Sequence, residues 1–490
     1  MDGPDPRRWL ILAVVALAQL MVVLDATIVN IALPSAQHAL HFSNIQRQWV
    51  VTAYALAFGS LLLLGGRLTD IVGRKATFIV GLAGFAGASA VGGAASSFGM
   101  LVVARACQGA FGALLAPAAL SLLTTTFEGS RDRGKAFGVF GGIAGAGGAI
   151  GLLLGGLLTQ YLSWRWCLYV NLIFAAIAGI GAVVLLRRQP ATGLRGGMDV
   201  PGLAAEVSGM FCVVYGFSNA ASDGWQAPAT WGLLAAGTVL LAAFAYIETR
   251  VRQPLLPLRI VLDRNRGAAY LSILITGAGM FGIFLFLTYY LQETLGFSPV
   301  MAGVAFLPMA GAIIVSANVA NIVLLPRIGP RWLVAPGMLA AAAGLAWLTR
   351  IGIHSSYSVA VLPPLLLISA GLGLVMSPSM NTGTAGVPPS DAGAASAMVN
   401  TGQQVGGSIG TSLLNTVAAS AAAGYLASHL SPQTTVNGHP APALVELAQV
   451  HSYSTAFWWA SAMFAAGSVL AALLFRRGAP ATAMQPVPMP

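Results

Sequence analysis

The amino-acid sequence predicts an all-α membrane protein with fourteen transmembrane helices. Hydrophobic residues make up 57% of the chain and charged residues only 8%, whereas a soluble domain carries about 25% charged residues. So few charges cannot cover a water-facing surface, and lipid is the solvent that suits an apolar exterior. The 59 glycines fit this setting, because small residues let membrane helices approach closely.

Fourteen apolar segments are long enough to cross a bilayer, which takes about 20 residues. The first eight lie near 10–32, 48–66, 76–97, 99–125, 136–159, 165–187, 200–219 and 229–248. The other six lie near 267–291, 300–324, 332–351, 358–380, 393–425 and 453–475. Between the last two, residues 431–449 predict an irregular outside loop.

The basic residues test both the count and the orientation of these spans. If both termini are cytoplasmic, 20 of the 24 lysines and arginines fall in cytoplasmic loops, as the positive-inside rule requires. The opposite side holds Arg47, Arg165 and Arg350, and Arg105 lies within a span. The net charge of +10 is spread over short loops without a continuous basic face, which argues against a nucleic-acid partner.

The loop between the second and third predicted spans combines glycines with charges. Gly66 and Gly73 allow a tight turn between closely packed helices, and Asp70, Arg74 and Lys75 can pair with one another or with a helix end. We expect a charged latch that forms in one conformation and breaks in another. An ordinary positive-inside loop is the alternative, which the spacing of these residues disfavours.

Asp25 in the first span and Arg105 in the fourth are ionisable residues inside apolar segments. Such residues are costly in hydrocarbon and are usually functional. At about 1.5 Å per residue, both lie at a similar depth below the outer surface and could meet if the two spans adjoin. Removal from water disfavours the charged carboxylate, which makes proton uptake accessible near neutral pH. A purely structural ion pair is the alternative.

Two further spans carry unusual residues. The fifth predicted span is rich in glycine and offers a smooth, bendable face to another helix, with simple packing as the alternative. Glu206 is a second carboxylate, about seven residues into the seventh span. It could relay protons or could point to the cytoplasmic interface. The glycines of interest in the fifth span are Gly147, Gly151, Gly155 and Gly156.

These motifs together resemble the major facilitator superfamily, and within it the fourteen-span drug:proton antiporters. Residues 66–75 are similar to the family's signature loop, although Ile71 stands where a basic residue is frequent. Residues 24–34 are similar to its first-span motif, and Arg105 to its fourth-span arginine motif. The fifth-span glycines resemble the antiporter motif, but Leu152 replaces its usual proline, which weakens the case for antiport and keeps import open.

The resemblance implies a major facilitator fold, with two six-helix bundles plus two additional helices. Spans one and four are neighbours in that fold, so Arg105 is expected to meet Asp25 and to tune its proton binding. The expected division is an N-terminal bundle at 1–190, two additional helices with a cytoplasmic linker at 191–266, a C-terminal bundle at 267–478 and a disordered tail at 479–490.

The resemblance also implies a function: a proton-coupled antiporter, not an enzyme, that exports small lipophilic drugs or natural products, including cations, by alternating access. It would be a monomer in the cytoplasmic membrane with both termini cytoplasmic. The proton gradient would supply the energy without a cofactor, and small molecules, protons and the lipid bilayer would be its partners. Candidate substrate-binding residues are Asn30, Trp49, Tyr54, Gln108, Asn171, Phe281, Asn400 and Gln404.

Three alternatives to export stay open at this stage. The missing proline keeps a proton-coupled importer open as an alternative. A transport-dead receptor would bind without flux. A membrane-embedded lipid enzyme would need clustered nucleophiles or metal ligands, but the six histidines are scattered without ligand spacing, so no metal site is expected.

Overall fold

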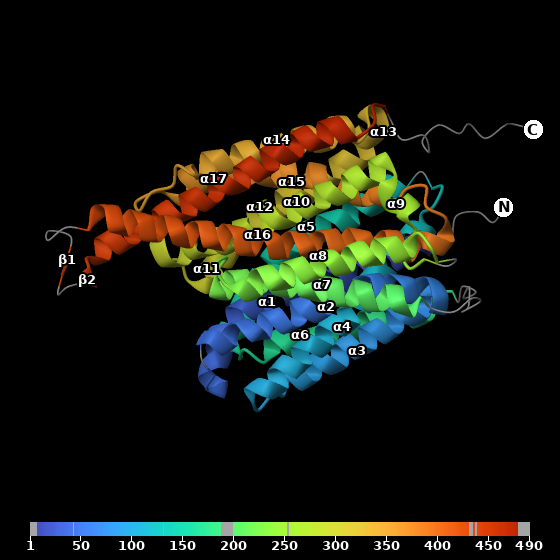
Figure 1. Ribbon diagram of the computed structural model, residues 1–490, viewed down its shortest axis with the longest axis horizontal. Coiled ribbons are helices and arrows are strands. Elements are labelled where there is room, and N and C mark those ends of the chain that lie inside the picture. Colours follow the sequence, from blue (N-terminus) through green and yellow to red (C-terminus); the bar gives the residue numbers. More distant parts are fainter. Residues whose placement is uncertain are drawn as a thin grey trace, which may run out of the picture.

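The computed structural model describes residues 7–42, 44–130, 132–187, 199–251, 254–430, 435–436 and 439–478. Within these ranges the chain is almost entirely helical, and the long helices lie side by side along one axis (Figure 1). Strands β1 (Thr435–Val436) and β2 (His439–Pro440) form a short antiparallel pair. The predicted all-α class is confirmed.

The first eight predicted spans are all helices. They are α1 (Arg8–Leu40), α2 (Asn44–Val72), α3 (Arg74–Gly93), α4 (Phe98–Thr126), α5 (Arg133–Tyr161), α6 (Trp166–Leu185), α7 (Val200–Asp223) and α8 (Pro228–Glu248). A short helix, α9 (Leu258–Leu262), follows in the connector to the next span.

The C-terminal part contains more breaks. The ninth span is α10 (Arg264–Tyr289) with the π-turn η1 (Tyr290–Thr294), and the tenth is divided into α11 (Pro299–Ala305), α12 (Leu307–Val319), η2 (Ala320–Leu324) and α13 (Leu325–Ile328). The remaining elements are α14 (Arg331–Leu348), η3 (Tyr357–Val361), α15 (Leu362–Gly383), η4 (Pro389–Asp391), α16 (Ala392–His429) and α17 (Pro442–Leu474).

Hydropathy alone supports thirteen spans among the described residues, not fourteen. The additional predicted span is α16, a helix of 38 residues whose many glycines and polar side chains make it less apolar. It packs against α10, α17 and α2 and lies among the other long helices (Figure 1). Neighbouring helices cover much of its surface, so α16 needs less apolar side-chain area than a lipid-facing helix.

Three predicted boundaries were clearly wrong. Helix α2 continues to Val72, beyond the predicted end at residue 66, so Gly66 and Asp70 lie within a helix and only Gly73 separates α2 from α3. Helix α1 continues to Leu40, beyond the predicted end at residue 32, and α17 begins at Pro442, within the stretch predicted as an irregular loop. Hydropathy averaged over a window of residues detects only the apolar part of a helix, which is the part that suits hydrocarbon. Polar residues such as Gln37 and Glu446 can extend a helix beyond that part, since they do not break the helix itself.

The helix contacts repeat between the two ends of the chain. Helix α1 packs against α5, and α10 packs against α16. In each pair, glycines at four-residue intervals face the partner helix. A Cβ atom added to Gly147 would lie 2.9 Å from Cγ1 of Val23, and one added to Gly406 would collide with the carbonyl oxygen of Leu274. The predicted close-packing face of the fifth span is therefore present, and a similar face occurs in α16.

The additional pair α7–α8 lies where the N-terminal and C-terminal helices meet. Helix α7 packs against α8, α2 and α16, and in Figure 1 it lies between α2 and α16. The hydroxyls of Thr52 on α2 and Ser218 on α7 are 3.1 Å apart. On the other side, the indole nitrogen of Trp225 donates to Oγ1 of Thr416 on α16 over 2.9 Å. The α7 segment thus contacts both parts of the molecule.

Candidate functional site

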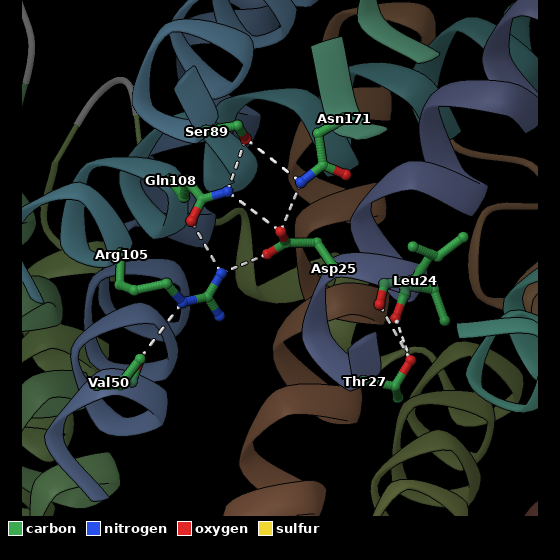
Figure 2. Close-up of polar contacts among 9 residues, drawn as sticks. Leu24, Asp25, Thr27, Val50, Ser89, Arg105, Gln108 and Asn171 are labelled. Carbon is green, nitrogen blue, oxygen red and sulfur yellow. Dashed lines mark hydrogen bonds and ion pairs between the residues drawn. The ribbon is translucent and has the colours of Figure 1, made fainter. Parts of the chain in front are cut away.

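A buried ion pair joins α1 to α4. Asp25 has no exposed surface and Arg105 is 1% exposed, and Nη1 of Arg105 lies 2.6 Å from Oδ2 of Asp25 (Figure 2). The contact expected from the matching depths of the two residues is present. Their part in proton coupling stays a prediction.

Two amides hold the other carboxylate oxygen of Asp25. Gln108 of α4 donates from Nε2 to Oδ1 over 3.1 Å, and Asn171 of α6 donates from Nδ2 to the same atom over 2.7 Å. Both amides also donate to the hydroxyl of Ser89 on α3, over 2.7 and 3.3 Å. Figure 2 shows the side chains of Arg105, Gln108 and Asn171 converging on Asp25, with Ser89 beside the two amides. Side chains from four helices thus form one buried polar network.

The guanidinium of Arg105 makes three further contacts. Its Nε donates to the carbonyl oxygen of Val50 over 3.3 Å, and Nη1 donates to Oε1 of Gln108 over 2.9 Å. The ring centroid of Tyr54 lies 4.3 Å from the guanidinium carbon, within the range of a cation–π interaction. Protonation of Asp25 would remove the counter-charge from a cation held in an apolar interior. The network therefore connects the carboxyl of Asp25 on α1 to groups on α2 and α4.

A small apolar cavity touches this network. Its volume is about 10 Å³, roughly the space that one water molecule needs. Arg105 contributes to its wall, and four of the other eight lining residues lie on α1, C-terminal to Asp25. The lining residues are Val29, Ala32, Leu33, Ala36, Val50, Leu101, Arg105, Trp164 and Leu168.

The predicted latch aspartate reaches across to the C-terminal helices. Asp70, 7% exposed, accepts hydrogen bonds from the backbone amides of Gly393 over 3.0 Å and Ala394 over 3.3 Å. These amides form the first turn of α16, where the helix dipole favours a negative charge. A Cβ added to Gly66 would lie 2.6 Å from Cβ of Ala397. We call these contacts between α2 and α16 the Asp70 seam.

The two basic residues of the predicted latch contact other N-terminal helices. Arg74 donates from Nε to the hydroxyl of Ser121 on α4 over 2.9 Å. Lys75 donates to the carbonyl oxygens of Val183 and Leu186 at the end of α6. Gly73 has a φ of 102° and precedes α3, which explains why glycine suits this turn. In these contacts Asp70 joins the two parts of the molecule, while Arg74 and Lys75 brace the N-terminal helices.

A second polar link between the two parts was missed from the sequence. Arg133, at the start of α5, donates from Nε to Oδ1 of Asn381 over 2.9 Å and from Nη2 to Oγ1 of Thr384 over 3.2 Å. Asn381 in turn donates to Oδ1 of Asn321 over 3.0 Å. The sequence placed Arg133 among the loop cations, since an amide partner some 250 residues away leaves no local signal.

The predicted substrate-binding residues divide into two sets. Tyr54, Gln108 and Asn171 belong to the Asp25 network. Trp49 is 41% exposed and lies 5.9 Å from the ring of Tyr215 on α7. Asn400 instead donates to the Ser396 carbonyl in its own helix, and Gln404 is half-buried. The side chains of Asn30 and Phe281 are not among those that the structure describes.

Ser89 is the network residue that sequence reasoning missed, because one serine in an apolar helix is common. Its replacement by alanine is expected to lower the free energy of unfolding by about 1 kcal/mol, the usual worth of a hydrogen bond, since two buried amides would lose an acceptor. Thermal unfolding of purified Ser89→Ala would measure the loss. Ser96→Ala, at an exposed position, is the control, and equal effects of the two changes would contradict the role of Ser89.

Comparison with known proteins places this arrangement in a family. The sequence profile of the Major Facilitator Superfamily matches residues 15–411. The chain belongs to the major facilitator superfamily. The family predicted from the motifs is therefore confirmed, and this major facilitator is a multi-pass membrane protein of a transporter family, not of an enzyme family.

Curated relatives of this major facilitator include resistance and export proteins. The puromycin resistance protein pur8 of Streptomyces alboniger is 50% identical over 96% of this chain and 92% of its own length. The cephamycin export protein CmcT of Amycolatopsis lactamdurans is 39% identical over 84% of this chain and 86% of its own length. The tetracenomycin C resistance and export protein of Streptomyces glaucescens is 36% identical over 86% and 77%.

A solved structure supports the fold independently. The human organic anion transporter MFSD10 (TETRAN) superposes with a TM-score of 0.63, covering 95% of this chain and all of that chain. At 16% sequence identity the likeness concerns the fold alone. The predicted major facilitator fold is confirmed.

Proposed function

We propose that this major facilitator is a proton-coupled antiporter that exports small lipophilic drugs or natural products across the cytoplasmic membrane. The observation that carries the proposal is the fully buried ion pair of Asp25 and Arg105, with amides on the same carboxylate. A buried pair contributes little net stability compared with apolar residues of the same volume. Its presence in a chain related to export proteins therefore supports a role in coupling.

In the proposed cycle, the charge of Asp25 controls the N-terminal helices. A proton arriving from outside, by way of the small cavity beside Arg105, neutralises Asp25 and releases the guanidinium from the carboxylate. The helices α1, α2 and α4 then change their packing, and substrate leaves outward. Loss of the proton to the cytoplasm restores the ion pair and resets the protein.

The Asp70 seam would hold one end state of this cycle. Both links described above, from Asp70 to α16 and from Arg133 to α15, lie at the end of the molecule that the positive-inside rule assigns to the cytoplasm. Closure of the cytoplasmic side corresponds to the outward-facing state of an alternating-access transporter. We propose that the seam breaks when the cytoplasmic side opens to take up substrate, and that the protein works as a monomer with both termini cytoplasmic.

Export is favoured over import by the names of the relatives, which include export proteins for cephamycin and tetracenomycin C. Leu152 in place of the antiporter-motif proline does not prevent close packing of α5 on α1, since Gly147 and Gly155 each approach α1. The direction of proton movement decides between antiport and import.

Inside-out membrane vesicles that contain a pH-sensitive dye test the proposal. After the lumen is acidified, addition of puromycin is expected to raise the luminal pH in vesicles with the wild-type protein, because drug entering the lumen exchanges for protons. Asp25→Asn is expected to abolish this signal at equal protein level. Asp223→Asn, at an exposed aspartate, is the matched control and should behave as wild type.

Two results would count against the proposal. Equal proton signals from wild type and Asp25→Asn would remove Asp25 from coupling. Drug leaving the lumen together with protons would show import instead of export.

A further inference from the structure

Glu206 on α7 is a buried carboxyl group outside the Asp25 network. Its side chain has no exposed surface. Neither of its carboxyl oxygens has a hydrogen-bond partner among the residues that the structure describes. Asp25, equally buried, receives hydrogen bonds from three side chains. The Asp25 carboxylate is therefore stabilised by hydrogen-bond donors, whereas the Glu206 carboxyl has none among the described residues.

The charged groups around Glu206 are mostly acidic. Glu248 on α8 acts on it electrostatically; Glu248 is 5% exposed and accepts the backbone amides of Leu255 and Leu256 over 3.2 and 3.0 Å. Asp199 precedes α7, and Arg67 of α2 and Asp199 both act on Glu248. Helix α16, which also packs on α7, has no aspartate, glutamate, lysine or arginine between Ala392 and His429.

Asp199 adds a second buried oxygen without a partner. Its Oδ1 accepts the amide of Gly202 over 3.0 Å, while Oδ2 has no partner within the described part of the chain. A Cβ added to Gly202 would lie 3.2 Å from Oε1 of Glu248, so the Asp199 and Glu248 carboxyls lie on the same side of α7. Three carboxyls thus lie near one another, and Arg67 acts on one of them, Glu248.

An ionised Glu206 would carry two costs. A charge without hydrogen-bond partners is expensive in an apolar interior, and the negative charge of Glu248 would repel it. A bound proton removes both costs. Intramembrane carboxyls of this kind are expected to mark proton pathways.

The position of Glu206 connects it to the Asp70 seam. Helix α7 packs against both α2 and α16, the two helices that the seam joins. Arg67, which acts on Glu248, lies three residues before Asp70 on α2. Separation of α2 from α16 would bring water to this end of α7, and hydration favours the ionised carboxylate.

We propose that Glu206 is a second proton-binding site, which holds a proton while the Asp70 seam is closed and releases it when the seam opens. The site is formed by α7 and α8, the pair of helices added to the two six-helix parts. Its use in transport rests on the proposed function, but the binding of the proton does not.

Infrared spectroscopy of the full-length protein in nanodiscs can detect the proton directly. The chain has only five glutamates, so carboxyl-¹³C glutamate distinguishes their protonated C=O band from that of aspartates. We expect a ¹³C-shifted band near neutral pH that is lost completely in Glu206→Gln and kept in Glu128→Gln, at an exposed glutamate. In Gly66→Ala, which crowds the seam, the band is expected to fall at the same pH.

The possible results separate the two proposals. A protonated band that persists in Glu206→Gln would overturn the site. Should that variant fail to fold, absence of the band from labelled wild type near neutral pH would overturn it equally. An unchanged band in a Gly66→Ala protein with a demonstrably open seam would overturn proton release. None of these results depends on drug-driven proton movement, which tests the proposed function by itself.

Discussion

Arg105→Gln is expected to lower the free energy of unfolding by about 3–5 kcal/mol, because it leaves the Asp25 carboxylate buried without its counter-charge. Both side chains are almost completely buried, at 0% and 1% exposed, so water cannot replace the lost partner. Unfolding of the purified protein by SDS in mixed micelles would measure the loss. Drug-driven proton movement is expected to be abolished as well.

The double variant Asp25→Asn, Arg105→Gln separates charge pairing from general damage to the core. It removes both charges and keeps groups that can form hydrogen bonds with Gln108 and Asn171. Most of the lost stability is expected to return, while proton coupling stays absent. A double variant no more stable than Arg105→Gln would mean that the buried charge of Asp25 is not the cause of the loss.

Gly66→Ala is expected to shift the protein away from the closed Asp70 seam. The new Cβ would lie 2.6 Å from the carbonyl oxygen of Gly393 and 2.6 Å from Cβ of Ala397, closer than real contacts allow. Backbone atoms cannot move aside as a side chain can, so α2 and α16 must separate. A cost of about 1.4 kcal/mol changes the ratio of closed to open protein tenfold, and the drug-export rate is expected to fall about tenfold.

Distances between spin labels would measure this shift. Cysteines introduced at Val72 and Ser390, both exposed, place one label at the end of α2 and the other just before α16. The label distance should lengthen in Gly66→Ala. Gly87→Ala is the control, since an added Cβ there has no atom within 4 Å. The same distance in all three proteins, with normal export, would show that the seam does not govern the cycle.

Much of the candidate site could be predicted because ionisable residues are rare in apolar spans. Asp25 and Arg105 could be recognised as candidates for this reason. Counting residues along their helices predicted that both lie at a similar depth in the membrane. Gln108 follows Arg105 by three residues and so shares its helix face. Ser89 and the link from Arg133 to Asn381 could not be predicted, because neither a serine in a helix nor a loop arginine reveals its distant partner.

Segment length and polarity were enough to predict the class of the protein, the positions of most helices and the costly residues within them, because lipid imposes both on every span. Which helices meet became clear from the fold alone. It placed Asp70 on the first turn of α16 and α7 between α2 and α16, and it left Glu206 without a hydrogen-bond partner in the described part of the chain. Such contacts depend on packing between residues far apart in sequence, which apolar periodicity does not encode.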